Sequence, residues 1–251
     1  MEKDEKMYHI KLSKNDIEGA KFAILPGDPG RVGSIAKYLE NPKKIGQNRE
    51  YTAYLGTIKN EKILIISTGM GGPSTAICIE ELAQIGITHL IRVGTSGGMQ
   101  LDISAGDVVI ATGAIRQEGT SKEYLPIEFP AIADLDVSIA LRDSAKEQGL
   151  TYHTGVVQCK DSFYGQHSPE KMPISYELQN KWNAWIKGGA LCSEMETAAL
   201  FTVSSTLRLH AGAILLVIWN QEREKQGLSQ EKCFDTDRAI KVVIGAIKKL
   251  I

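Results

Sequence analysis

Short apolar segments alternate with amphipathic ones along this chain. Apolar runs at residues 21–26, 62–68, 89–95, 107–115, 154–160 and 211–219 predict strands. Apolar residues at helical spacing over 32–39, a stretch ending near residue 85, residues 193–203 and the C-terminal segment 240–251 predict helices. Strands that are apolar on both faces and separated by helices predict a mostly parallel or mixed sheet covered on both sides. The expected fold class is therefore α/β.

Two segments, residues 116–130 and 161–190, show the least periodicity. We expect them to be loops and to form walls of a site. No linker-like stretch, internal repeat or low-complexity tract interrupts the pattern, so we expect a single domain over residues 1–251.

Composition and charge narrow the class of protein. The chain has 251 residues, of which 43% are hydrophobic and 24% charged, and its formal net charge is −1. This charge creates no field that favours nucleic acid or an anionic membrane. The start of the chain has no apolar signal segment, the longest apolar run is half a membrane span, and the four distant cysteines indicate reduced thiols. We expect a cytoplasmic protein without nucleic-acid or membrane partners.

The predicted strand ends carry the candidate chemistry, because ligands of α/β sheets bind at the carboxyl ends of strands. In "LPGDPGRVG" (25–33), Asp28 suits a helix N-cap and Pro29 the first helical position. The free N–H groups of that helix start, with Gly27 and the charge of Arg31, favour an anion. A strand-to-helix turn with a solvated arginine explains these residues equally well.

Two further strand ends are rich in glycine. The glycines of "STGMGGPSTA" (67–76) allow close approach to a ligand, or form a tight packing turn. In "LIRVGTSGG" (90–98), Arg92 lies within an apolar strand and Thr95 follows. A buried guanidinium requires either a carboxylate in a structural salt bridge or an anionic ligand.

Carboxylates mark a fourth strand end. In "CSEMETAAL" (192–200), Glu194 and Glu196 flank Met195 at a predicted helix start. They either cap the helix or bind the hydroxyls of a sugar through charge-assisted hydrogen bonds. The strand ends together suggest phosphate plus sugar, and the sequence contains no competing metal cluster, Ser-His-Asp spacing or nucleophilic cysteine.

A further segment, "CKDSFYGQHSP" (159–169), combines adjacent aromatic residues with Gln, His and Lys. Flat rings beside polar donors suit a planar, hydrogen-bonding ligand.

With these motifs in order, the sequence resembles the nucleoside phosphorylase-I family and, within it, the bacterial uridine phosphorylases. The resemblance covers nearly the whole chain and is carried by "YHIKLSKNDIEGAKFAILPGDPGRV", "NREYTAYLG", "STGMGGPSTAICIEELAQIGITHLIRVGTSG", "EFPAIAD" and "EMETAAL". It implies an α/β fold around a central mixed, barrel-like sheet flanked by helices, assembled as a hexamer of three dimers. It also implies a pentosyltransferase activity, the reversible phosphorolysis of a nucleoside to base and ribose 1-phosphate.

The resemblance also assigns site residues. It implies a phosphate site at Gly27, Arg31, Arg92 and Thr95, with Arg49 donated across the dimer. It implies ribose contacts from Glu194, Met195 and Glu196, with His9 from the other subunit, and a base site at Phe163 and Gln166. Arg92, Glu196 and Gln166 are the expected catalytic residues. It implies no required cofactor, and a potassium site between subunits at Glu50, Ser74 and the backbone of Met70.

The base-binding segment departs from the family pattern. Uridine phosphorylases carry an arginine two residues after the glutamine, where this chain has Ser168, and a second arginine in the late segment, where it has Gln221. Lys160 and His167 are the nearest replacement cations. We favour Lys160 as the main one because a lysine ends in a movable point charge that can reach from a strand end, whereas His167 is only partly protonated at neutral pH. Both could instead be solvated surface residues.

Three alternative functions remain open. A purine nucleoside phosphorylase would carry an aspartate in the late segment, where "VIWNQ" has none. A phosphate-independent nucleosidase would not need Arg31, Arg49 and Arg92, and a non-catalytic nucleoside-binding protein would not need the ribose carboxylate. The expectation from the sequence is uridine cleavage in pyrimidine salvage.

Overall fold

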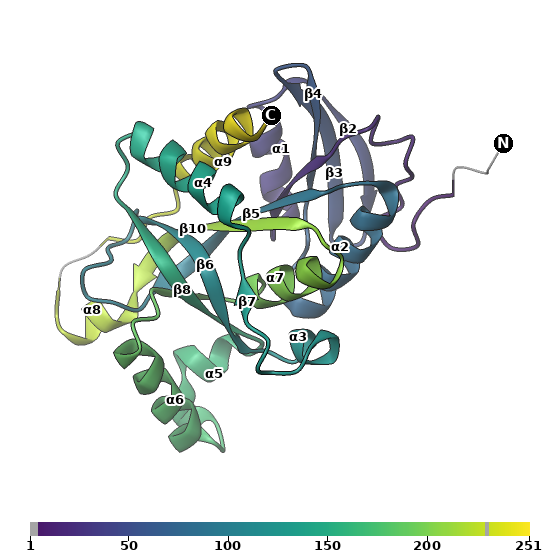
Figure 1. Cartoon of the computed structure of the whole chain (residues 1–251). Helices are drawn as coiled ribbons and strands as arrows, with labels where there is room; N and C mark the ends of the chain where they lie inside the picture. The colour runs from purple at the N-terminus through teal and green to yellow at the C-terminus, as the bar shows by residue number, and fades with distance from the viewer. Residues whose placement is uncertain (1–4, 229–230) are drawn as a thin grey trace.

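The computed structural model describes residues 5–228 and 231–251 (Figure 1). The strands are β1 (Phe22–Pro26), β2 (Glu40–Asn48), β3 (Tyr51–Ile58), β4 (Glu61–Ile66), β5 (His89–Gly98), β6 (Val108–Gln117), β7 (Ala131–Ile132), β8 (Tyr152–Lys160), β9 (Cys192–Glu194) and β10 (His210–Asn220). The helices are α1 (Val32–Ala36), α2 (Gly72–Ile85), α3 (Thr120–Tyr124), α4 (Leu135–Glu147), α5 (Phe163–His167), α6 (Ser175–Lys187), α7 (Thr197–Thr206), α8 (Gln221–Lys225) and α9 (Asp237–Leu250), with 3₁₀ turns η1 (Pro29–Arg31) and η2 (Pro169–Lys171).

Strand β5 is the centre of the sheet. It pairs in parallel with β10 along its length and with β1 over its first half, from His89 to Val93. The sheet continues beyond β1 through the parallel strand β4 and the antiparallel strands β3 and β2. All six apolar runs expected to be strands are strands in the structure, which confirms that part of the sequence reading.

Part of the sheet closes into a barrel. Among the described strands, β5, β10, β6, β8 and β9 form a closed ring, in which β10–β6 and β9–β5 are antiparallel and the other pairs parallel. The short strand β9 completes the ring by pairing Ser193 and Cys192 with Gly97 and Gly98 at the end of β5. The expected α/β fold with a mixed, barrel-like sheet is confirmed.

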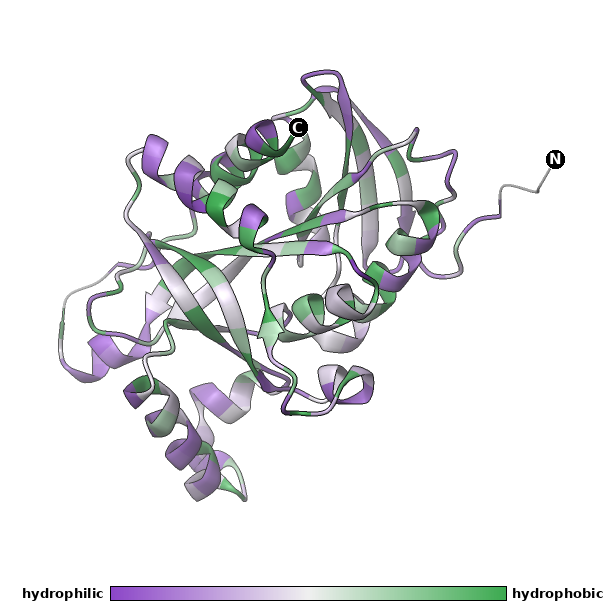
Figure 2. Cartoon of the chain, viewed as in Figure 1, coloured by the Kyte–Doolittle hydropathy of each residue, from purple (hydrophilic) through white to green (hydrophobic). Residues whose placement is uncertain are grey.

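Helices cover both faces of the sheet and enclose two apolar cores (Figure 1). Helices α2 and α7 pack in one core, and α1, α4 and α9 in the other. Alternate residues of β1 enter opposite cores, Leu25 the first and Ile24 the second, so this strand is apolar on both faces as expected. Figure 2 shows the apolar residues of α9 and of the strands, and the mixture of polar and apolar residues along α6.

The sequence reading of residues 161–190 as a loop is wrong, because α5, η2 and the whole of α6 lie there. Helix α6 does carry an apolar stripe, since Leu178, Trp182, Trp185 and Ile186 recur at helical spacing, and the sequence reading missed this period. Figure 1 shows α6 extending away from the body of the molecule. The segment 116–130 likewise contains the end of β6 and the short helix α3.

Other sequence expectations have simpler outcomes. All four cysteines are free thiols. No helix within the described residues is long and apolar enough to span a membrane. The segment examined for a signal sequence begins with residues 1–4, which lie outside the described part of the chain.

Candidate active site

A cavity of about 890 Å³ opens where β1 and β9 share one edge of β5. Between the last residue paired with β1, Val93, and the first paired with β9, Gly97, this edge of β5 has no strand partner in the described chain. The ends of β1, β4 and β5 meet there, whereas β9 enters from the opposite direction. The predicted site residues in its wall are Gly27, Arg31, Glu50, Met70, Arg92, Thr95, Lys160, Phe163, His167, Glu194, Met195 and Glu196.

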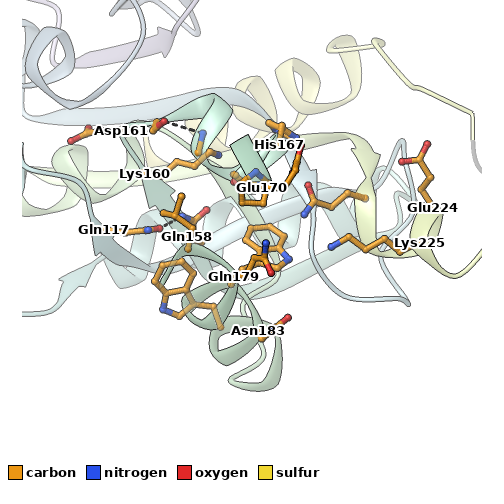
Figure 3. Close-up of a pocket in the computed structure, with 18 of the residues that line it drawn as sticks. Gln117, Gln158, Lys160, Asp161, His167, Glu170, Gln179, Asn183, Glu224 and Lys225 are labelled. Carbon is orange, nitrogen blue, oxygen red and sulfur yellow. Dashed lines mark hydrogen bonds between the residues drawn. The ribbon is translucent and has the colours of Figure 1, made fainter. Parts of the chain in front are cut away.

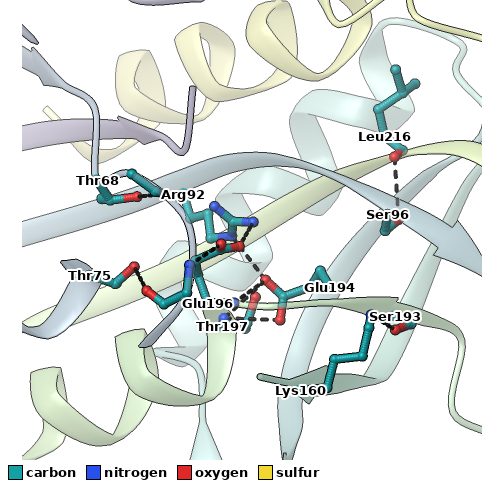
Figure 4. A network of polar contacts seen from close by, with 12 residues as sticks. Thr68, Thr75, Arg92, Ser96, Lys160, Ser193, Glu194, Glu196, Thr197 and Leu216 are labelled. Carbon is teal, nitrogen blue, oxygen red and sulfur yellow. Dashed lines mark hydrogen bonds and ion pairs between the residues drawn. The ribbon is translucent and has the colours of Figure 1, made fainter. Parts of the chain in front are cut away.

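Arg92 in β5 contacts two carboxylates, as the burial of its charge requires. Its side chain is 5% exposed, Nε donates to Glu194 Oε2 at 3.1 Å, and Nη2 donates to Glu196 (Figure 4). Its Nη1 is buried and has no hydrogen-bond partner among the described residues. The guanidinium lies over Gly94, where an added Cβ would be 2.7 Å from Nη2. Arg92 is therefore in a salt bridge and still has a free donor at the cavity.

Arg31 lies at the end of η1 and also has an unused donor. Asp28 caps this turn by accepting from the Gly30 N–H at 2.8 Å, with Pro29 following, as the sequence predicted. The same carboxylate is 3.8 Å from Arg31 Nε, and Arg31 Nη1 is buried with no partner in the described chain. Burial and the positive charge of Arg92 lower the pKa of Arg31. Two neighbouring guanidinium groups with unpaired N–H donors make a site that an anion would stabilise.

The carboxylates of Glu194 and Glu196 have different hydrogen-bond partners. Glu194 accepts from Arg92 and from the backbone N–H groups of Glu196 and Thr197 at 2.9–3.0 Å, so it caps the start of α7. Glu196 accepts from Arg92 and from the Gly71 N–H at 2.7 Å. Burial raises the pKa of Glu196, while Arg92 opposes that shift. The capping alternative is correct for Glu194, and Glu196 is the carboxylate with oxygen lone pairs left for a ligand.

Phe163, His167 and Lys160 line the base end of the cavity, the part formed by α5 and the end of β8. The Phe163 ring is 51% exposed and lies 4.2 Å from the His167 ring, centroid to centroid. Lys160, at the end of β8, is only 6% exposed and donates to Ser193 Oγ at 2.5 Å. Burial lowers the pKa of Lys160, and burial and Lys160 lower the pKa of His167. Lys160 is not a solvated surface residue, so that alternative is wrong.

A second cavity of about 760 Å³ adjoins the first and shares Lys160, His167 and Trp219 with it (Figure 3). Gln166 lines this second cavity rather than the first. Helices α6 and α8 also line this second cavity, and they are joined by a hydrogen bond of 2.8 Å from Trp182 Nε1 to Glu222. The predicted base-binding residues are therefore brought together at the junction of the two cavities.

Three predicted residues do not line either cavity of this chain. His9 is bound to the Glu81 carboxylate through its ring at 2.7 Å and through its backbone N–H. Arg49 is exposed in the turn between β2 and β3, with a positive φ of 50°. Ser74, in the first turn of α2, donates to Glu50 at 2.6 Å.

The Glu50–Ser74 pair supplies only oxygen ligands. The Ser74 hydroxyl lowers the pKa of the Glu50 carboxyl and so favours its charged form. Gly69, at φ +74°, packs against both side chains: an added Cβ would be 2.7 Å from Glu50 Cγ and 2.8 Å from Ser74 Oγ. A carboxylate and a hydroxyl are suited to a hard cation such as potassium, and the described residues contain no cluster of three His, Cys, Asp or Glu side chains for other metals.

Sequence reasoning missed the polar residues behind the base end. Ser193 connects Lys160 with Gln166 through hydrogen bonds, and it also contacts Gln158, which in turn donates to Gln117. The available signal was weak: Ser193 precedes Glu194, and Gln158 interrupts an apolar strand. Asn220 has a structural role, because its side chain donates to the carbonyls of Gln100 and Ile103 and accepts from the first N–H groups of α8.

Comparison with known proteins places this geometry in a family. A sequence model described as "Phosphorylase superfamily" matches residues 21–251. The chain is 55% identical to the "Uridine phosphorylase" of Treponema pallidum (strain Nichols), over 97% of this chain and 94% of that protein. It is 37% identical to the "Uridine phosphorylase" of Escherichia coli (strain K12), over 98% of both chains. It is also 36% identical to the "Guanosine phosphorylase" of Halorubrum lacusprofundi, over 98% of this chain and 99% of that protein.

Proposed function

This chain belongs to the phosphorylase superfamily, and from that premise we propose that it catalyses the reversible phosphate-dependent cleavage of uridine to uracil and ribose 1-phosphate. It is a pentosyltransferase, with the whole chain, residues 1–251, as one nucleoside phosphorylase domain. The observation that carries the proposal is the pair of buried Nη1 atoms of Arg31 and Arg92 in one cavity wall, neither of which has a hydrogen-bond partner within residues 5–228 and 231–251.

Phosphate binds between the two guanidinium groups. Arg31 and Arg92 donate from their free N–H groups, Thr95 supplies a hydroxyl, and Gly27 leaves room because a Cβ there would be 3.7 Å from Arg92 Nη1. Charge-assisted hydrogen bonds of this kind contribute roughly 1.5–3 kcal/mol each. They hold phosphate against the sugar, so that attack on C1′ becomes effectively intramolecular.

Ribose binds at Glu196, with Met195 and Glu194 beside it. Glu196 is held in place by Arg92 and the Gly71 N–H, and its oxygens keep lone pairs that can accept from a ribose hydroxyl. As the glycosidic bond loosens, C1′ acquires positive charge, and the adjacent phosphate oxygens stabilise it.

The base binds at the junction of the two cavities. The exposed Phe163 ring packs against it, Gln166 hydrogen-bonds its edge, and Lys160 donates to a carbonyl with His167 as a further hydrogen-bonding partner. The leaving uracil develops negative charge, so a buried ammonium stabilises the transition state more than the ground state. Arg92, Glu196 and Gln166 are thus the catalytic residues, and Lys160 replaces the missing family arginine.

A second subunit completes each site in this proposal. Within one chain the charges of Arg31 and Arg92 are balanced by Glu194 and Glu196, so a dianion needs a further cation. The exposed turn that carries Arg49 is suited to supply it across a dimer. His9, on the N-terminal arm, reaches the neighbour's ribose from the same interface, and three such dimers form a hexamer.

We also propose that Glu50, Ser74 and the Met70 carbonyl, together with the same atoms of the second subunit, hold a structural potassium ion. The chemistry itself requires no cofactor, and phosphate is the co-substrate. The expected location is the cytoplasm, where nucleosides and phosphate are available for pyrimidine salvage.

The test is the dependence of base release on phosphate. Uridine, inosine, guanosine and thymidine are each incubated with and without phosphate, and free base is measured. We expect uracil release that requires phosphate. Equal release without phosphate would indicate a nucleosidase, and absence of release from every nucleoside would indicate a binding protein.

A purine substrate is the second candidate, because one relative in the comparison is a "Guanosine phosphorylase". The late segment, with Trp219 and Gln221 lining the second cavity, has no aspartate to protonate a purine. Faster cleavage of inosine or guanosine than of uridine in the same assay would move the assignment to purines.

A further inference from the structure

A line of polar side chains runs from β6 through β8 and β9 to α5, behind the base end of the site. Gln158 donates to Gln117, and the side-chain oxygens of Gln158 and Gln166 both lie within hydrogen-bond distance of Ser193 Oγ. Lys160 donates to the same Oγ (Figure 4). We call these residues (Gln117, Gln158, Ser193 and Gln166) the amide relay.

The Ser193 hydroxyl cannot serve both amide oxygens. A hydroxyl has one proton to donate and two lone pairs that accept. The Lys160 ammonium has only donors, so it occupies one lone pair. The proton then goes to one amide oxygen, and the other glutamine must turn its NH₂ group to the second lone pair, since the two ends of an amide have nearly the same shape.

Gln158 decides which amide turns. It is 1% exposed, its NH₂ group lies against the Gln117 side-chain oxygen, and its own oxygen lies against Ser193 Oγ. Ser193 is the one partner of that oxygen among the described residues, and a buried carbonyl without a donor is costly. The Ser193 proton is therefore held by Gln158. Gln166, which is less buried, turns its NH₂ group to Ser193 and its carbonyl oxygen toward the cavity.

We propose that Ser193 and Gln158 are positioning residues that fix the orientation of the Gln166 amide and thereby select the class of base. An inward carbonyl of Gln166 beside the Lys160 ammonium presents an acceptor next to a donor. The complementary edge is a ring N–H beside a C=O, as in uracil, thymine, hypoxanthine and guanine. Cytosine and adenine carry the reverse pattern, a ring nitrogen acceptor beside an amino group, and meet two mispaired groups. This inference rests on the proposed function.

Two substitutions at Gln158 with similar shape separate the alternatives. Gln158→Met removes both hydrogen bonds, frees the Ser193 proton for the Gln166 oxygen, and turns the Gln166 NH₂ group to the ligand. We expect the ratio of kcat/KM for uridine to that for cytidine to fall about ten- to a hundredfold, the usual effect of correcting one mispaired buried group. Gln158→Glu can only accept at this position, so it keeps the Ser193 proton and the ratio stays at the wild-type value or rises.

Ser193 provides an independent pair. Ser193→Ala removes the hydroxyl and lets the Gln166 amide adopt either orientation, so the ratio falls, whereas Ser193→Thr retains a hydroxyl and restores it. Inosine and adenosine form a second matched pair of substrates. A role in folding alone would change thermal stability without changing these ratios, so melting temperatures are measured for all variants.

Calorimetric titration of the same proteins with uracil and with cytosine, in the presence of phosphate, gives a readout that does not depend on turnover. The relay is supported if wild type prefers uracil and Gln158→Met and Ser193→Ala lose that preference. It is overturned if these two variants keep the wild-type preference, or if wild type binds both bases equally. Absence of phosphorolysis would refute the proposed function, while the binding ratio would still decide on the relay.

Discussion

Substitution of the two arginines of the proposed anion site should affect stability to very different extents. The Arg92 side chain is 5% exposed and contacts two carboxylates that are themselves buried, those of Glu194 and Glu196. Arg92→Met leaves both carboxylates without their cation, and loss of one partner from a buried ion pair typically costs about 3–5 kcal/mol of unfolding free energy. Arg31 has one carboxylate at 3.8 Å, from a well-exposed Asp28, and is repelled by Arg92. Arg31→Met should change stability by no more than about 1 kcal/mol.

Phosphate affinity, in contrast to stability, should respond clearly to substitution of Arg31. The loss of one or two charge-assisted hydrogen bonds from Arg31, at roughly 1.5–3 kcal/mol each, raises the KM for phosphate at least about tenfold. The assay combines denaturant unfolding, the KM for phosphate, and the rise in melting temperature on adding phosphate, which reports binding to the folded state. Arg142→Met is the control, because Arg142 pairs with Asp143 on the surface at 2.8 Å.

Two results would refute this reasoning. If Arg31→Met destabilised the protein as much as Arg92→Met, Arg31 would be a structural residue with a partner that its geometry does not reveal. If Arg31→Met kept the wild-type response to phosphate, the unpaired Nη1 atoms would not mark the anion site.

Three further predictions follow from the same geometry. Lys160→Met should lower uridine turnover about a hundredfold, as for loss of a transition-state donor. Thermal stability should be retained because Lys160 has no ion pair within the described residues. Near-normal turnover would show that no cation is needed there. Mixing inactive Arg31→Ala with inactive Arg49→Ala should restore activity, because a hybrid dimer contains one site with both arginines; no recovery after verified subunit exchange would exclude a shared site. Burial and the adjacent His210 lower the pKa of His89 below its usual 6.5, so the unfolded state binds more protons and the free energy of unfolding should fall as the pH drops below about 6.5. His89→Phe should reduce this loss when denaturant unfolding is measured across pH 5–8. An unchanged slope of stability against pH would contradict the assignment.

The periodic part of the fold could be predicted from sequence because each element carries its own signal. The apolar runs of β1, β4, β5 and β10 are buried on both faces, and α9 places Ile240, Val243 and Ile247 in the core. The Asp28–Pro29 helix start is equally local, since the cap is made within three residues. Helix α6 also carries such a signal, at Leu178, Trp182, Trp185 and Ile186, but the sequence reading did not recognise it among the polar residues of that segment.

The site divides in the same way. A cation inside an apolar strand requires an anionic partner, so Arg92 could be recognised from the sequence as a candidate site residue. The sequence could not decide whether that partner is a carboxylate or an anionic ligand. The structure supplies two carboxylates and leaves one donor over, which needs β9 to run against β5 and return Glu194 and Glu196 to Arg92. Strand direction is a property of the closed barrel and not of the strand's own residues.

The sequence alone indicated six of the strands, the candidate arginines Arg31 and Arg92 and the unusual base segment, because those features depend on residues near one another in the chain. Only the tertiary structure decided how Ser193, Gln158 and Gln166 meet beside Lys160, since they come from β9, β8 and α5 and are joined by closure of the barrel. A hydroxyl with one proton and several candidate partners acquires a definite hydrogen-bond pattern only when all of those partners are in place.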